Sequence, residues 1–164
     1  MLTTAFYLVA DWRTGAMRYA NAGHPKPLHI RRHADQVAPL ANVAGKSEPV
    51  LGLFEDAAYQ TSEVRLSPGD VVMLFTDGLY EVQDGKNELY SQAMLVAGVQ
   101  HRAQLPVPRL FDLLLAEIRR FSADGGFADD VCIVGMEYAG PSAPGSEPTA
   151  SARLEAQPEP ASGR

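Results

Sequence analysis

Residues 71–78 read Val71-Val72-Met73-Leu74-Phe75-Thr76-Asp77-Gly78. Five apolar residues in a row, bounded by turn-forming residues, are typical of a strand that is buried on both faces. Pro68-Gly69-Asp70 precedes the run and is also a turn sequence. A second apolar run, at residues 131–136, directly follows Asp129-Asp130. The two runs predict two buried strands of one sheet.

The position of the acidic residues beside these runs suggests a cation site. Asp77 follows the first run, and Asp129 precedes the second. If the two strands are antiparallel neighbours, both carboxylates lie at the same rim of the sheet. Neighbouring carboxylates repel each other, and a hard cation such as Mg²⁺ or Mn²⁺, which prefers oxygen ligands, would compensate them. The same residues also fit a plain turn and a solvated corner, since Asp and Gly dominate turns.

The remaining pattern predicts an α+β fold. Alternating or β-branched stretches predict strands before the central run, and helical spacing of apolar residues appears only after it. The order is strands, two helices and one strand, which differs from alternating βαβ units. The expected strands cover residues 4–10, 16–22, 28–31 and 59–66, the expected loop covers 34–50, and the expected helices cover 87–99 and the run that begins at Pro108.

Residues 139–164 differ in composition from the rest of the chain. They consist mainly of Ala, Gly, Ser, Pro and Glu, and they contain a single leucine, Leu154. Such a segment cannot bury enough apolar area to offset the entropy lost on ordering. We therefore expect one folded domain over residues 1–138 and a disordered tail over residues 139–164.

Charge and cysteine usage narrow the class of protein. The 164 residues include 14 Lys and Arg against 20 Asp and Glu, a formal net charge of −6. This balance argues against binding to nucleic acid or to an anionic membrane. No apolar run approaches the roughly 18–20 residues of a membrane span. Cys132 is the single cysteine, so no intramolecular disulfide can form, and a reducing cytoplasm is the expected location.

Three histidines and the cysteine are further candidates for functional residues. His24, at the end of an expected strand, could donate a proton or contact a phosphate, although a lone histidine is more often structural. His29 and His33 are four residues apart, but His29 lies on an expected strand with no acidic or cysteine partner nearby in the sequence, which disfavours zinc. Cys132 is expected to be a buried, inert core residue.

Taken together and in order, these pieces resemble the metal-dependent PPM-type serine/threonine protein phosphatases. The resemblance is to the branch of bacterial sigma-factor regulators related to stage II sporulation protein E. It spans residues 3 to about 136. The stretches that carry it are Thr3-Thr4-Ala5-Phe6-Tyr7, residues 19–27 with Asn21-Ala22-Gly23-His24-Pro25, Leu51-Gly52-Leu53, residues 66–81 with Thr76-Asp77-Gly78, and Ala128-Asp129-Asp130-Val131.

The resemblance implies a β-sandwich flanked by helices, with a binuclear Mn²⁺ or Mg²⁺ site at one end. In the family the metals generate a bridging hydroxide that attacks a phosphoserine or phosphothreonine in line. Asp77 matches the aspartate of the family's Thr-Asp-Gly motif, and Asp129 matches the first aspartate of its Asp-Asp motif. Both would ligate the second metal, and Gly78 would let the backbone pass close to the site. The resemblance gives His24 no catalytic role.

The chain also departs from the family pattern. Family members carry two earlier motifs, a Gly-Asp and an Asp-Gly, whose aspartates hold the first metal and bridge the pair. None of the acidic residues before Asp70 lies in such a motif; they are Asp11, Asp35, Glu48, Glu55, Asp56 and Glu63. The chain therefore resembles the C-terminal part of the domain with the N-terminal strands missing, and we expect the isolated chain to be weakly active or inactive. Val131-Cys132 is a smaller departure from the usual Ile/Met-Thr.

Two functions of different classes follow from these observations. The first is a phosphatase that acts on a phosphorylated regulatory protein of the anti-sigma-factor antagonist type, encoded here only in part. The second is a catalytically incomplete, phosphatase-like module that binds a partner. Neither predicts a nucleic acid or a membrane as partner. An uncovered sheet face or edge would also favour a homodimer.

Overall fold

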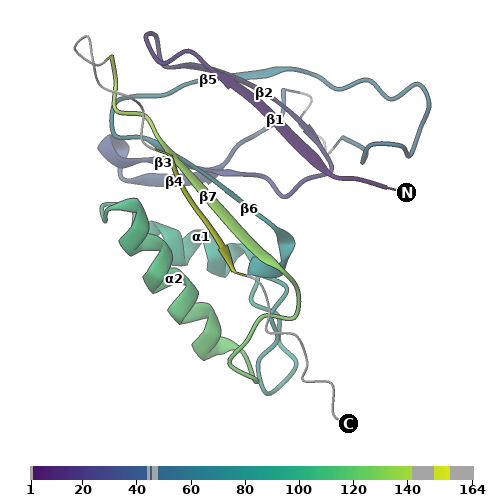
Figure 1. Ribbon diagram of the computed structural model, residues 1–164, viewed down its shortest axis with the longest axis vertical. Helices are drawn as coiled ribbons and strands as arrows, with labels where there is room; N and C mark the ends of the chain where they lie inside the picture. The colour runs from purple at the N-terminus through teal and green to yellow at the C-terminus, as the bar shows by residue number, and fades with distance from the viewer. Residues whose placement is uncertain (1, 44, 46–47, 142–149, 156–164) are drawn as a thin grey trace.

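The computed structural model describes all residues except 1, 44, 46–47, 142–149 and 156–164. Its described part consists of two antiparallel sheets and two helices, in three layers (Figure 1). The first sheet has the order β1-β2-β5, formed by Ala5–Ala10, Ala16–Ala22 and Ser62–Arg65. The second has the order β4-β3-β6-β7-β8, formed by Gln36–Pro39, Leu28–Arg31, Val71–Phe75, Val131–Glu137 and Ala150–Glu155. The expected α+β fold is confirmed.

Strand β6 is buried on both faces because different layers cover its alternate residues. Val71, Met73 and Phe75 face the helices and belong to the larger core cluster. Val72 belongs to the smaller cluster between the sheets, with Met17 of β2. A strand that packs on both faces has no polar face, which accounts for the continuous apolar run.

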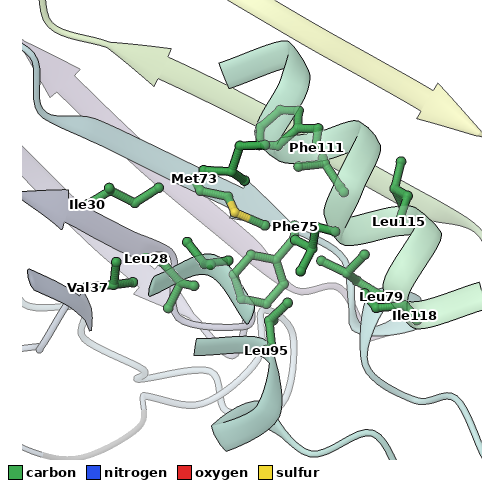
Figure 2. Close-up of a cluster of buried hydrophobic side chains, with 14 of the residues drawn as sticks. Leu28, Ile30, Val37, Met73, Phe75, Leu79, Leu95, Phe111, Leu115 and Ile118 are labelled. Carbon is green, nitrogen blue, oxygen red and sulfur yellow. The ribbon is translucent and has the colours of Figure 1, made fainter. Parts of the chain in front are cut away.

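Helices α1, Gln92–Gln100, and α2, Val107–Phe121, cover the outer face of the second sheet (Figure 1). The side chain of Ser91 caps α1 by accepting a hydrogen bond from the amide of Met94, and Pro108 occupies the first turn of α2. The buried face of α2 repeats at helical spacing. Figure 2 shows this packing, with Phe111, Leu115 and Ile118 of α2 and Leu95 of α1 against Met73 and Phe75.

The predicted pairing of the two apolar runs is confirmed. β6 and β7 are antiparallel neighbours, with Val71 opposite Glu137 and Phe75 opposite Ile133. The end of β6 and the start of β7 therefore share one rim of the sandwich. Two short 3₁₀ helices complete the described elements: η1, Arg32–Ala34, joins β3 to β4, and η2, Asp77–Leu79, directly follows the residue after β6.

Two strands lie where the sequence predicts none. β4 lies inside the expected loop 34–50, and β8 lies inside the expected tail 139–164. Both pair with a neighbouring strand along the backbone, at the two edges of the second sheet. Backbone pairing at an edge needs no apolar side chains, so composition alone does not reveal it. Residues 142–149 and 156–164 lie outside the described residues, and for them the tail stays a prediction.

Neither of the two described α-helices is long and apolar enough to serve as a membrane span.

Candidate metal centre

Asp77 and Asp129 both lie at the rim formed by the end of β6 and the start of β7. Asp77 begins η2 and is exposed, and Asp129 is exposed two residues before β7. The main-chain oxygen of Asp77 accepts hydrogen bonds from the amides of Tyr80 and Glu81, which fixes the turn that carries it. The two segments therefore meet as the sequence predicts.

The hydroxyl of Thr76 links the two acidic segments. Its Oγ1 donates to the main-chain oxygen of Asp130 at 3.0 Å and accepts from the amide of Cys132 at 2.9 Å. The amide of Thr76 also donates to the main-chain oxygen of Cys132 at 3.1 Å. These three hydrogen bonds continue the β6–β7 ladder through the site and hold the residue before Asp77 against the residues that follow Asp129.

Gly78 allows the closest approach of the two segments. A Cβ at this position would lie 2.7 Å from the main-chain oxygen of Asp130 and 3.1 Å from that of Asp129. A Cβ essentially never lies within 3.0 Å of a backbone oxygen, so any larger residue would push the Asp129-Asp130 peptide away. Glycine is required here by space rather than by its backbone angles.

The donor atoms at the rim suit a hard divalent cation. Exposed carboxylates bind Mg²⁺ and Mn²⁺ while leaving several water ligands in place. Oδ1 of Asp129 accepts from the amide of Asp130 at 2.7 Å, which orients its carboxylate. Within the part of the chain that the structure describes, however, no three His, Cys, Asp or Glu side chains form a cluster able to hold a metal. The described residues thus fit part of a metal site.

The other candidate residues are separated in the fold. His29 is buried, and its Nε2 lies 3.0 Å from Oδ2 of Asp70, so the absence of an acidic partner inferred from the nearby sequence was wrong. The imidazole of His33 contacts the main-chain oxygen of Pro68 at 2.9 Å. Cys132 is half-buried rather than fully buried.

His24 lies in the turn between β2 and β3. The buried side chain of Asn21 closes this turn, because its Oδ1 accepts from the amide of His24 and its Nδ2 donates to the main-chain oxygen of the same residue. The sequence gives no signal for the clamping role of Thr76, which depends on contacts with residues more than 50 positions away.

Comparison with known proteins agrees with this geometry. The family model described as Stage II sporulation protein E matches residues 1–139. Phosphoserine phosphatase RsbP of Bacillus subtilis (strain 168) is 26% identical over 131 residues, which cover 80% of this chain and 30% of RsbP. The chain therefore spans less than a third of that relative's length.

Solved structures show the same fold. The crystal structure of the RsbU and RsbW domains of Rv1364c from Mycobacterium tuberculosis has a TM-score of 0.69 at 25% identity, over 85% of this chain and 38% of that one. The SiaA-PP2C domain of Pseudomonas aeruginosa has a TM-score of 0.69 at 20% identity, over 82% of this chain and 51% of that one. The phosphatase domain of SpoIIE from Bacillus subtilis, presoaked with Mn, has a TM-score of 0.61 at 16% identity, over 82% and 56%.

Proposed function

Because the chain belongs to the stage II sporulation protein E family of PPM-type phosphatases, we propose that it forms part of a protein serine/threonine phosphatase domain. Asp77 and Asp129 are its metal ligands. The observation that carries this proposal is the set of hydrogen bonds through which Thr76 holds the two acidic segments at one rim. The likeness to phosphoserine phosphatase RsbP supports the same reaction class.

The cofactor that fits these oxygen donors is Mn²⁺ or Mg²⁺. When bound, such a metal supplies an activated water and neutralises charge on the phosphoryl oxygens. The chain's own contribution is positional: Asp77 and Asp129 provide carboxylate oxygens, Thr76 fixes their spacing, and Gly78 leaves room for the two backbones to approach.

Two carboxylates are too few for a two-metal centre. Such a centre holds its cations about 3.5–4 Å apart, which requires at least one bridging carboxylate and further ligands. We propose that polypeptide beyond residues 1–164 supplies them. Residues 1–164 alone should then bind Mn²⁺ weakly and hydrolyse a phosphoserine peptide at a negligible rate.

The proposed substrate is a phosphorylated regulatory protein of the anti-sigma-factor antagonist type, in the cytoplasm. The sigma-factor-regulator branch that the motifs resemble supports this choice of substrate. The formal charge of −6 is compatible with a protein substrate and unfavourable for nucleic acid.

Titration calorimetry with Mn²⁺ tests the proposal on residues 1–164. We expect weak binding that is lost in Asp77→Asn and in Asp129→Asn. Asp11→Asn is the matched control, because Asp11 is an exposed turn aspartate at the opposite end of the first sheet. Binding that survives Asp77→Asn would contradict the assignment of the ligands.

One observation favours a second candidate function. No cluster of three potential ligand side chains occurs among the described residues, which also fits a phosphatase-like module that binds a phosphorylated partner without hydrolysing it. Such a module would bind a phosphoserine peptide equally well with Mn²⁺ and with a chelator. The phosphatase proposal predicts binding that needs the metal.

A further inference from the structure

A polar cavity lies between the turn that joins β2 to β3 and the loop that follows β4. Its volume is about 60 Å³, which is sufficient for water. Every side chain in the lining is polar, so the cavity suits a polar or charged occupant. Its lining consists of Asn21, Gly23, His24 and Lys26 from the β2 end and the turn, and of Asn42 and Glu48 from the loop.

Glu48 contributes a carboxylate oxygen that lacks a partner. Its Oε1 accepts from the amide of Gln60 at 2.6 Å, whereas its Oε2 is buried and has no hydrogen-bond partner among the described residues. A buried carboxylate oxygen without a partner is costly, because it has lost its hydration and gained nothing in exchange. Such an oxygen calls for a cation or a hydrogen-bond donor.

His24 contributes a ring nitrogen with a free lone pair. Its Nδ1 lies 2.8 Å from the main-chain oxygen of Pro25. A carbonyl oxygen can only accept, so Nδ1 carries the hydrogen of the neutral imidazole and Nε2 keeps its lone pair. Among the contacts of the described residues, none engages Nε2. Nε2 is therefore available to an electron-pair acceptor.

The turn and the loop are held together before any occupant binds. The side chain of Asn21 bonds to both main-chain groups of His24, at 2.9 Å and 2.8 Å. Gly23 has a φ of +70°, and a Cβ there would lie 2.4 Å from Cγ1 of Val50, two residues after Glu48. The close packing of these two segments fixes the backbone on both sides of the cavity.

His24 and Glu48 each have one polar atom bonded to the main chain and a second that is free. This is the usual arrangement around metal ligands: a ligating histidine donates its other ring N–H to a carbonyl or carboxylate, and a ligating carboxylate is itself hydrogen-bonded. The ion pairs of the described residues do not include one between His24 and Glu48. A species that bridges the two side chains fits this arrangement.

From this geometry we propose that Nε2 of His24 and Oε2 of Glu48 are ligands of a divalent cation of the zinc type. The site is separate from the candidate centre at Asp77 and Asp129, and it does not depend on the proposed phosphatase function. Imidazole nitrogen suits Zn²⁺, and a site with such a ligand binds Mn²⁺ more weakly. The two centres therefore differ in the metal that they prefer.

The proposed site is open rather than closed. Two protein ligands leave coordination positions for water, unlike the four protein ligands of a structural zinc site. This agrees with the absence, among the residues that the structure describes, of any cluster of three His, Cys, Asp or Glu side chains able to hold a metal. A bound cation would join the loop that carries Glu48 to the turn that carries His24.

Lys26 opposes the cation, because its ammonium lines the same cavity and repels a second positive charge. Its side chain is half-buried and has a flexible stem, so the ammonium can turn towards solvent when a cation enters. We therefore expect Lys26→Met to tighten Zn²⁺ binding. Loss of Zn²⁺ binding in Lys26→Met would overturn the proposal.

The main test is a calorimetric titration with Zn²⁺ of residues 1–164 that carry Asp77→Asn, so that the rim lacks one of its ligands. We expect one Zn²⁺ to bind per chain. His24→Gln and Glu48→Gln, each added to this background, should weaken binding by about 100-fold or more, because loss of an outer-shell partner alone typically costs about 10–100-fold. His33→Gln is the matched control, since His33 also contacts a proline carbonyl but does not line the cavity. It should leave the affinity unchanged.

Absence of Zn²⁺ binding, or an affinity that neither His24→Gln nor Glu48→Gln changes, would overturn the proposal and leave the cavity to water. If these variants do not fold, ¹⁵N spectra of the Asp77→Asn protein decide. Zn²⁺ should shift the Nε2 signal of His24 and the amide signal of Gln60, which donates to Glu48; signals that do not move would refute the site. Because the rim is disabled throughout, neither result bears on the proposed phosphatase function.

Discussion

Strand β6 has an aspartate near each end, and the two differ in burial and in their hydrogen-bond partners. Asp70 precedes the strand and is 2% exposed; its Oδ2 accepts from the amide of Ser67 and lies 3.0 Å from Nε2 of His29. Asp77 follows the strand and is exposed. The same residue type in similar turn sequences therefore serves folding at one end and remains available to a ligand at the other.

The largest expected effect is a difference in the free energy of unfolding between variants at Asp70 and at Asp77. Asp70→Ala removes the carboxylate that accepts from the amide of Ser67 and faces the imidazole of His29, and it should lower the free energy of unfolding by about 2–5 kcal/mol, because both partners lose this contact inside the protein. Asp77→Asn changes an exposed residue and should stay within about 0.5 kcal/mol. Urea unfolding of both variants measures the difference. Equal destabilisation would mean that Asp77 also serves folding.

A smaller effect contrasts the glycines beside these aspartates. Gly78→Ala should cost about 1–3 kcal/mol through overpacking and should weaken Mn²⁺ binding, because the new Cβ displaces the Asp129-Asp130 peptide. Gly69 has open space around it and a φ of +89°, so Gly69→Ala should cost about 1–2 kcal/mol through backbone strain alone. Its Mn²⁺ affinity should match that of the wild type. Weakened Mn²⁺ binding in both variants would remove the distinction between the two ends.

The next effect in size is expected from removal of the Thr76 hydroxyl. Thr76→Val keeps the shape but leaves the amide of Cys132 and the carbonyl of Asp130 without this partner, at a cost of about 1–2 kcal/mol in stability. Mn²⁺ affinity should fall with it, since the spacing of the two carboxylates loosens. Thr76→Ser retains the hydroxyl and serves as the control. A Thr76→Val variant with wild-type Mn²⁺ affinity would show that the hydroxyl does not position the site.

The smallest expected effect concerns Glu117. In contrast to Asp77, its carboxylate accepts hydrogen bonds from the side chains of Tyr90 and Arg102. Burial acts to raise the pKa of Glu117, but hydrogen bonds from Tyr90 and Arg102 outweigh it, and the pKa lies below its usual value of 4.5. A lowered pKa in the folded state adds stability above the unfolded pKa, and this stability is lost as the pH falls through the folded value. Glu117→Gln should therefore flatten the stability profile below about pH 4.5 by at most about 1 kcal/mol. An unchanged slope in acid unfolding would contradict the ion pair.

The central pairing could be predicted from the sequence because both runs are continuously apolar and bounded by turn residues. The placement of Asp77 and Asp129 at one rim follows from that pairing. β4 and β8 could not be predicted, since the pairing that places each at a sheet edge is made by backbone groups, which composition does not encode.

The polar contacts of the site could not be predicted from the sequence either. The partners of His29 and Thr76 lie 41 and more than 50 positions away, and nothing in local spacing encodes such contacts. The sequence did single out His24, at the end of the expected strand 16–22. Only the fold shows that His24 and Glu48 line one cavity, and that Oε2 of Glu48 is buried with no hydrogen-bond partner among the described residues.

The central claim is that Asp77 and Asp129 together bind the cation, whereas Asp70 does not. Paramagnetic broadening of backbone amide signals by substoichiometric Mn²⁺, recorded on ¹⁵N-labelled residues 1–164, tests it in one spectrum. We predict that signals of residues 76–79 and 128–131 broaden first, while those of residues 67–70, at the far end of β6, stay sharp. Broadening that begins elsewhere, or that persists unchanged in Asp77→Asn, would contradict it.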